Sequence, residues 1–247
     1  MIYDICTDNY SAFQIFEKNK LKPRAYFIPF QDRKSSETVS LCDERYKSNL
    51  VKVLNGKWDF KYYPKFSDMP KRFDTSIVDF DEVNVPSMWQ YTGYEKPYYI
   101  NQNYPFGRKP PKIPTDDPVG LYKTIRNGKW TPLTVDNIYN SVGVYRKKIE
   151  IFDTEKIFII SFLGCSSCLE LYVNGSFHGY SEGSHNTAEF NITDKLGKGE
   201  NEIVVVVHKW CNGTYLEAQD MFRSNGIFRD VLLFVHDKSY VYDYSVK

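Results

Sequence analysis

Glu217 and Asp220 are the two carboxylates whose spacing invites comparison with a catalytic pair, since three positions separate them. Glycoside hydrolysis uses two carboxyl groups that face the scissile bond across a cleft, about 5 Å apart or farther. A spacing of three residues puts both carboxyls on one local turn, so neither reaches the opposite face of a sugar. We therefore expect Glu217 and Asp220 to hold a loop through hydrogen bonds or salt bridges.

Cys165 and Cys168 have the spacing of half a zinc knuckle. No second pair of cysteines or histidines follows at ligand distance, and alternation along a strand would point the two sulfurs to opposite faces of a sheet. The four histidines form no motif, and the sequence has neither a phosphate-binding glycine-rich loop nor a Gly-x-Ser-x-Gly elbow. The residues alone therefore predict neither a metal site nor a catalytic constellation.

The charge of the 247-residue chain is balanced, with 32 Lys and Arg against 31 Asp and Glu. A net charge of +1 provides no field that would attract nucleic acid or an anionic membrane, so we expect neither partner. Five scattered cysteines do not resemble a disulfide framework, and the N-terminus lacks a basic segment followed by an apolar run. We expect a cytoplasmic protein.

Short strands separated by turns are the elements that the sequence predicts. Asn174-Gly175 lies between two apolar-bearing runs and is typical of a hairpin turn in which both residues take φ > 0. Residues 203–207 form a continuous apolar run, which favours a strand buried on both faces. Further strands are expected at residues 58–62, 147–152, 157–162 and 226–235.

Two regions depart from this pattern. Residues 1–50 are polar and weakly periodic, so we expect an extended N-terminal arm with a loop at residues 35–38. Residues 84–142 contain eight prolines, which lack a backbone donor and fix φ, and this predicts a long ordered loop system instead of sheet. With no amphipathic helix of 12 residues or more, residues 51–247 are predicted to form an all-β, antiparallel β-sandwich of jelly-roll type.

Four segments carry a family resemblance. In order, they are LNGKWDF at 54–60, VPSMWQ at 85–90 running on through Gly93-Tyr94 to Pro97, YINQNYP at 99–105 with Pro110-Pro111, and WCNGTYLEAQDMFR at 210–223 continuing through Gly226 to Val231. Together they resemble the N-terminal sugar-binding domain of family 2 β-galactosidases, and residues 22–27 are similar to that family's arm. The resemblance covers about residues 50–247. It implies a galactose-binding-domain-like jelly roll, which in the family precedes immunoglobulin-like domains and a (β/α)₈ barrel.

The resemblance also implies a division of labour, because the barrel supplies the family's catalytic glutamates and neither is in this chain. Loops of this domain would shape the galactose subsite of an enzyme that removes terminal β-D-galactosyl residues. Asn101 matches the family's asparagine that contacts the galactosyl unit. Asn212 matches an aspartate that binds sodium and a galactosyl hydroxyl, so it is the candidate sodium ligand here. Na⁺, and Mg²⁺ in the barrel, are the implied cofactors.

Structural interpretations compete with these roles. Asn101 could close a turn within a proline-rich loop, and Asn212, which precedes Gly213, could be a tight-turn residue in the left-handed conformation. Arg229 and Asp230 are expected to pair with each other and anchor the last strand. Three aromatic residues could either stack on a sugar or pack in the interior, namely Trp89, Tyr104 and Trp210.

Residues 123–142 form an additional segment relative to the family pattern. In the family, a Pro-x-Gly-x-Tyr motif leads directly into the next strand. Here residues 118–122 match that motif, but residues 123–142 intervene before residues 143–146, which resemble the same step a second time. The added segment leaves the placement of this loop open.

Three functions remain compatible with the sequence. The first is a non-catalytic domain that shapes the substrate site of a β-galactosidase and contacts its remaining domains and the β-galactoside. The second is a freestanding lectin-like carbohydrate-binding module. The third is a structural role, in which the arm and the sandwich mediate assembly of a homo-oligomer.

Overall fold

Asn174 and Gly175 form the tight turn that their residue types predict. In the computed structural model, which describes residues 1–5, 8–40, 42–100, 112–115, 124–126, 129–131, 139–217 and 219–247, both residues have positive φ angles, 48° and 85°. The turn joins strand β13 (Cys168–Val173) to strand β14 (Ser176–Glu182), and the two strands pair in antiparallel fashion. The predicted hairpin is therefore confirmed.

The hairpin belongs to a seven-stranded sheet with the order β2-β14-β13-β16-β10-β4-β6. Its other members are β2 (Glu17–Lys18), β16 (Gly199–His208), β10 (Val142–Ile151), β4 (Gly56–Tyr63) and β6 (Asp81–Val85). All of these pairings are antiparallel. The strands predicted at 58–62, 147–152 and 203–207 correspond to β4, β10 and β16.

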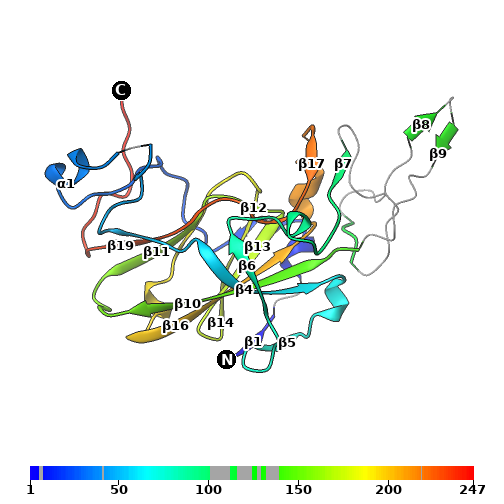
Figure 1. Cartoon of the computed structure of the whole chain (residues 1–247), viewed down its shortest axis with the longest axis horizontal. Coiled ribbons are helices and arrows are strands. Elements are labelled where there is room, and N and C mark those ends of the chain that lie inside the picture. Colours follow the sequence, from blue (N-terminus) through cyan, green and yellow to red (C-terminus); the bar gives the residue numbers. More distant parts are fainter. Residues whose placement is uncertain are drawn as a thin grey trace.

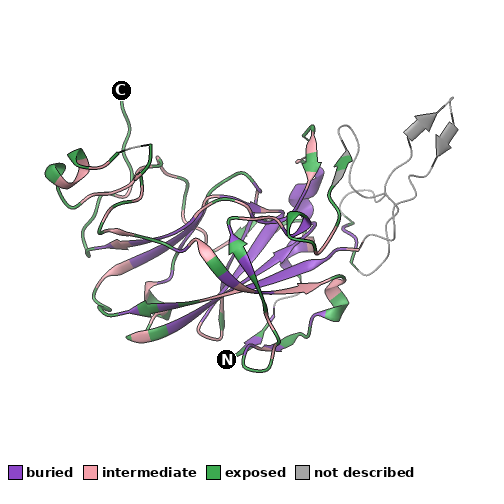
Figure 2. Ribbon diagram, viewed as in Figure 1, coloured by how far each residue is buried: buried purple, intermediate pink, exposed green. Residues whose placement is uncertain are grey.

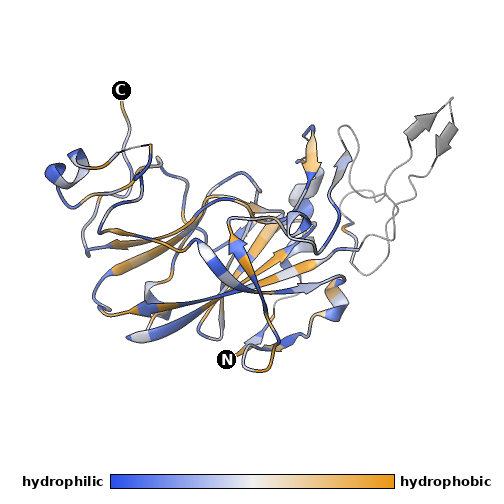
Figure 3. Ribbon diagram, in the orientation of Figure 1, coloured by the Kyte–Doolittle hydropathy of each residue, from blue (hydrophilic) through white to orange (hydrophobic). Residues whose placement is uncertain are grey.

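A four-stranded antiparallel sheet packs on one face of the larger sheet. Its order is β15-β11-β19-β3, with β15 (Ala188–Asn191), β11 (Ile157–Phe162), β19 (Val231–His236) and β3 (Val51–Val53). Figure 1 shows β11 and β19 above β10 and β16, and Figures 2 and 3 show that the facing strands are buried and hydrophobic. The predicted all-β, antiparallel sandwich is confirmed, whereas its jelly-roll connectivity stays a prediction.

Strand β16 is buried on both of its faces, as its continuous apolar run predicts. Successive side chains of a strand point to opposite faces, and here Ile203, Val205 and Val207 join the core between the two sheets. Val204 and Val206 point the other way, into a second hydrophobic cluster beside the N-terminus. In that cluster β1 (Ile2–Asp4) pairs with β5 (Arg72–Asp74), so the N-terminal segment covers the outer face of the larger sheet.

Short elements complete the described part of the chain. The further strands are β7 (Tyr98–Ile100), β8 (Thr124–Arg126), β9 (Lys129–Thr131), β12 (Cys165–Ser166), β17 (Met221–Arg223) and β18 (Gly226–Ile227). The helical turns are η1 (Asn9–Ser11), α1 (Arg33–Glu37), η2 (Phe66–Asp68), η3 (Trp89–Tyr91), η4 (Thr193–Lys195) and η5 (Asn212–Tyr215). None of the described helices is long and apolar enough to cross a membrane.

Three predictions about local structure need correction. The loop predicted at residues 35–38 is largely helical, because Asp32 caps α1 by accepting a hydrogen bond from the Ser35 amide at 2.8 Å. The proline-rich region 84–142 does contain sheet, since β7 pairs with β17 and β8 pairs with β9. The strand predicted at 226–235 is divided into β18 and β19, which belong to different sheets.

The polar arm lies against the sandwich through hydrogen bonds and ion pairs. Strand β2 extends the larger sheet by pairing with β14, and the Leu21 amide donates to the Glu189 carbonyl at 2.8 Å. Arg24 binds both carboxylate oxygens of Glu189 at 2.8 Å each, and both side chains are almost fully buried. Bidentate arginine–carboxylate pairs are among the stronger hydrogen bonds in proteins, so this pair fastens the arm.

Beneath the arm, two titratable side chains of the larger sheet are completely buried. Glu170 accepts hydrogen bonds from Asn9 at 3.3 Å and from Tyr172 at 2.8 Å, and Tyr10 stacks on the His208 ring at 4.6 Å. The Nε2 atom of His208 lies 4.0 Å from the Glu170 carboxylate. Burial raises the pKa of Glu170 to about 8 and lowers the pKa of His208 to about 3, so both side chains are neutral near pH 7.

Glu170→Gln should remove a pH dependence of stability. The folded pKa of Glu170 lies above its unfolded value of 4.5, so its contribution to stability is complete below pH 4.5 and is lost as the pH rises toward 8. The thermal midpoint of the variant minus that of the wild type should therefore increase by at least about 3 °C from pH 5 to pH 9, because only the wild type loses stability through residue 170. Unfolding midpoints across this range test it, and parallel profiles for the two proteins would contradict it.

Candidate functional site

The segment that follows β16 folds back onto the end of the sandwich as a buried 3₁₀ turn. The Cys211 amide donates to the Thr214 hydroxyl at 3.0 Å, and all four residues of η5 are buried. Asn212 and Gly213 have no positive φ angle, although such angles occur elsewhere in the described chain. Asn212 therefore lies in a tight turn, as the alternative interpretation predicts, but the turn is a 3₁₀ turn and Asn212 does not take the left-handed conformation.

The carboxylate of Glu182, at the end of β14, holds this turn. It accepts hydrogen bonds from the Gly213 amide at 2.8 Å and from Asn212 Nδ2 at 3.3 Å, and the Tyr180 hydroxyl donates to it at 2.7 Å. Burial raises the pKa of Glu182 to about 7, although these three donors oppose the shift. The Oδ1 atom of Asn212 is buried and has no hydrogen-bond partner among the described residues.

A buried ion pair joins the start of the same segment to the loop after η3. Lys209 is fully buried and its ammonium contacts the Glu95 carboxylate. Burial lowers the pKa of Lys209, while the charge of Glu95 opposes the shift. Glu95 also accepts a hydrogen bond from Gln90 at 2.7 Å, and Gln90 exchanges hydrogen bonds with Asn225 at 3.1 and 2.7 Å. Segments 85–97 and 210–231, which carry the family resemblance, therefore meet through one polar network.

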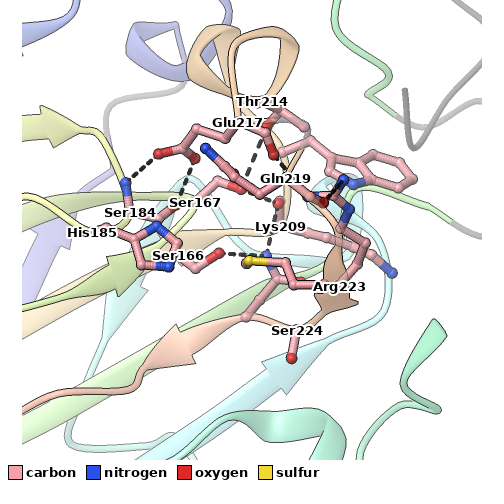
Figure 4. A pocket seen from close by; sticks show the side chains of 13 residues that line it. Ser166, Ser167, Ser184, His185, Lys209, Thr214, Glu217, Gln219, Arg223 and Ser224 are labelled. Carbon is pink, nitrogen blue, oxygen red and sulfur yellow. Dashed lines mark hydrogen bonds between the residues drawn. The ribbon is translucent and has the colours of Figure 1, made fainter. Parts of the chain in front are cut away.

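A small cavity opens beside this network (Figure 4). Ser167, Ser184, Lys209 and Glu217 are among the side chains that line it, and Figure 4 shows the carboxylate of Glu217 directed at Ser184. The cavity volume is about 30 Å³, which has room for one or two water molecules. The described residues alone therefore do not enclose a space for a sugar at this place.

Glu217 and Asp220 have the structural roles expected of them. Glu217 accepts hydrogen bonds from the amide and the hydroxyl of Ser184, both at 2.6 Å. Asp220 accepts a hydrogen bond from the hydroxyl of Tyr99, across the β7–β17 pair. Each carboxylate thus fixes a loop, and they bind separate partners on different elements.

The side chains of Cys165 and Cys168 lie apart from each other, as the sequence predicts. Cys165 is buried in the core between the sheets, whereas Cys168 is buried in a different cluster with Cys211. In the part of the chain that the structure describes, no group of three His, Cys, Asp or Glu residues is placed to hold a metal ion.

The remaining candidate residues divide into buried ones and ones outside the described residues. Trp89 and Trp210 are only 1% and 2% exposed, so they pack in the interior and offer no face to a sugar. Asn101 and Tyr104 lie outside the described residues. Asn212 is the one sequence-predicted site residue whose surroundings the described structure gives.

The expected pairing of Arg229 with Asp230 is wrong. Asp230 binds Arg45 at 2.7 Å and Asn55 at 2.8 Å, so it ties the start of the last strand to the arm and to the first motif. Burial opposes ionisation of Asp230, but hydrogen bonds from Tyr46, Asn55 and Arg45 lower its pKa. The Arg229 guanidinium instead donates to the His185 carbonyl at 3.0 Å.

Sequence reasoning missed the three charged residues that organise this region, Lys209, Glu95 and Glu182. Lys209 has a local signal, because it directly follows a strand predicted to be buried on both faces and precedes a tryptophan. Glu95 and Glu182 lie in ordinary polar surroundings along the sequence, and their partners are 114 and 31 positions away. No local pattern would have identified them.

Comparison with known proteins places these motifs in a family. The model of "Glycosyl hydrolases family 2, sugar binding domain" matches residues 51–132 and 131–237. The chain belongs to this family. The two matches meet inside residues 123–142, the additional segment that the sequence predicts.

Individual relatives of this family 2 sugar-binding domain agree with the assignment. A β-galactosidase of Actinobacillus pleuropneumoniae is 37% identical over 93% of this chain and 20% of that protein. A β-galactosidase of Priestia megaterium is 35% identical over 95% of this chain and 21% of that protein. The chain thus spans about a fifth of the length of these curated relatives.

A solved structure supports the fold of the domain. The β-glucuronidase of Bacteroides uniformis superimposes with a TM-score of 0.50 at 20% sequence identity. The match covers 75% of this chain and 18% of that chain. At this identity the likeness concerns the fold alone.

The buried ion pair predicts a strong, partner-dependent effect on the stability of the domain. Glu95→Gln should lower the free energy of unfolding by about 3–5 kcal/mol, because it leaves the charge of Lys209 buried without its carboxylate. The double variant Glu95→Gln/Lys209→Met should recover a large part of this loss.

Urea unfolding measures these changes. Glu82→Gln is the matched control, because it breaks an ion pair with Lys57 whose side chains are 57% and 75% exposed, and it should leave the unfolding free energy almost unchanged. A double variant that is as unstable as Glu95→Gln would contradict the prediction.

Proposed function

We propose that this chain is the non-catalytic sugar-binding domain of a β-galactosidase and that its loops shape the galactose subsite beside a catalytic domain. The observation that carries the proposal is the identity of 35–37% with proteins named β-galactosidase over at least 93% of the chain. Because those proteins are about five times as long, hydrolysis would depend on parts of the protein that this chain does not match.

The geometry of the motif loop supports a shaping role. The segment 209–217 is held at Lys209 by Glu95 and Asn225 and at Gly213 by Glu182, so these points of its backbone are fixed before any substrate arrives. Such preorganisation is what a substrate-positioning loop requires. Asn212 Oδ1 is buried and unpartnered among the described residues, which suits an acceptor for a substrate hydroxyl.

The β7–β17 ribbon supports contact with a further domain. Tyr99 and Phe222 pack against each other at 5.7 Å between ring centroids, yet they are 51% and 57% exposed. Aromatic side chains exposed together are typical of surfaces that another protein surface covers. We propose that the remaining domains of the parent enzyme cover this ribbon.

Sodium is the cofactor that we propose for this site. A hard cation prefers oxygen ligands, and Asn212 would supply one neutral carbonyl oxygen from its side chain. The charge count of the ligands sets cation affinity at such sites, so a site with asparagine at this position would bind sodium more weakly than one with aspartate. Mg²⁺ would belong to the catalytic barrel and not to this chain.

The isolated chain should neither hydrolyse nor tightly bind galactosides. Chromogenic β-galactoside turnover should equal that of a blank preparation, because the proposal assigns both catalytic carboxylates to another domain. Calorimetry should detect no binding of a β-galactoside at millimolar affinity. Turnover by the purified chain would overturn the proposal, and millimolar or tighter binding would favour the freestanding lectin-like module.

Asn101 provides a direct test in the full-length protein. Asn101→Ala should lower kcat/KM for a β-galactoside by roughly 5- to 150-fold, which corresponds to the 1–3 kcal/mol cost of an unpaired substrate hydroxyl. Asn103→Ala, two residues along the same motif, is the matched control and should retain most of the activity. Equal kcat/KM for Asn101→Ala and the wild type would remove Asn101 from the site.

A further inference from the structure

The carboxylate of Glu182 has the surroundings of an ionised acceptor. Three donors converge on its two oxygens, namely the Tyr180 hydroxyl at 2.7 Å, the Gly213 amide at 2.8 Å and Asn212 Nδ2 at 3.3 Å. Glu182 is 8% exposed and Tyr180 is completely buried. Because all three groups donate, a negatively charged carboxylate satisfies each of them.

The backbone at Gly213 comes unusually close to this carboxylate. A Cβ atom at residue 213 would lie 3.1 Å from Glu182 Oε2, so the absence of a side chain lets the amide reach its acceptor. The start of η5 is therefore placed relative to β14 by one carboxylate.

The same carboxylate determines which way the Asn212 amide points. The atom of residue 212 that faces Glu182 must donate a hydrogen, so it is Nδ2, and Oδ1 points elsewhere. Oδ1 has no partner among the described residues and Asn212 is only 4% exposed. Leaving a buried carbonyl oxygen unpaired destabilises the folded protein, and a bound donor would offset that cost.

An aspartate at residue 212 would replace this attractive hydrogen bond with a repulsive contact. One of its oxygens would take the place of Nδ2 and lie about as close to Glu182 as the amide nitrogen does now. Two buried like charges at that distance disfavour the folded state. The residue types at 182 and 212 are therefore not independent of each other.

We propose that Glu182 and Asn212 form a matched carboxyl–amide pair, in which Glu182 accepts the hydrogen bond from Asn212 Nδ2 and acts as the positioning residue that presents Asn212 Oδ1 to a ligand hydroxyl. The presentation to a galactoside rests on the proposed function, whereas the pairing rests on the contacts alone. Glutamine at 182 would let the Asn212 amide turn over and present Nδ2 instead. Glutamine at 182 with aspartate at 212 would restore an oxygen toward the ligand.

Thermal unfolding of the 247-residue chain tests the pairing through a double-variant cycle. Asn212→Asp alone should lower the midpoint by roughly 4–8 °C, because it brings two carboxylates together. Glu182→Gln alone should lower it by no more than about 3 °C, since the amide can turn over. The double variant Glu182→Gln/Asn212→Asp should regain most of the loss seen for Asn212→Asp.

Glu202 provides the matched control. It is also a buried carboxylate of the larger sheet, but it accepts its hydrogen bonds from Tyr3 and Thr75. Glu202→Gln should therefore add to the effect of Asn212→Asp without any recovery. If the effects of Glu182→Gln and Asn212→Asp are additive as well, the pairing is refuted.

Kinetics of the full-length protein test the positioning role. Glu182→Gln, although stably folded, should lower kcat/KM for a β-galactoside by roughly 10- to 100-fold, because a donor replaces the acceptor. The double variant should come within about tenfold of the wild type. A coupled unfolding cycle with unchanged kinetics for Glu182→Gln would overturn the positioning role. A full-length wild type without galactosidase activity would refute the proposed function instead, and the unfolding cycle would still decide the pairing.

Discussion

The structure depends on one strand being covered on both faces. Val204 and Val206 of β16 point away from the core between the sheets, and they are buried in a cluster to which the N-terminal strand β1 and its partner β5 contribute. The two faces of β16 therefore belong to different clusters, one between the two sheets and one beneath β1 and β5. Since Lys209 directly follows this strand, the position of the motif loop depends on both clusters.

Polar contacts fix the loop in addition to the hydrophobic cluster that holds Trp210, Cys211 and Tyr215. Glu95 meets Lys209, Glu217 meets Ser184 and Glu182 meets Gly213, each joining segments that are distant in sequence. In a buried setting such contacts are strong when every partner is present and costly when one is missing. Asn212 Oδ1 is an exception within this network, because its donor is missing among the described residues.

The sequence predicted the turns and strands whose signals lie within a few neighbouring residues. The Asn174-Gly175 turn and the apolar run at 203–207 have signals within a few residues, and both are confirmed. The family motif at 210–223 predicts Asn212 as a site residue, which stays a prediction, and Asn101 lies outside the described residues.

Long-range charge pairing was not predictable from such patterns. The pairing of Asp230 was predicted wrongly because its neighbour Arg229 is close in sequence, while its actual partner Arg45 is 185 positions away. The same reason hides Glu182, whose donors at 212 and 213 come from another element. Strand periodicity reports which face a residue takes, but it does not report what another segment places opposite it.

The segment that the sequence predicts as an addition, residues 123–142, would be a place where this architecture accepts new sequence. It enters the connection that leads into β10, yet β10 keeps its full register with both β4 and β16. Loop-closure entropy grows only with the logarithm of loop length, so doubling a connection costs about 0.6 kcal/mol. Lengthening this connection is therefore cheap for the sandwich, and it gives evolution a place to elaborate the surroundings of a sugar site while the strands that support it keep their pairing.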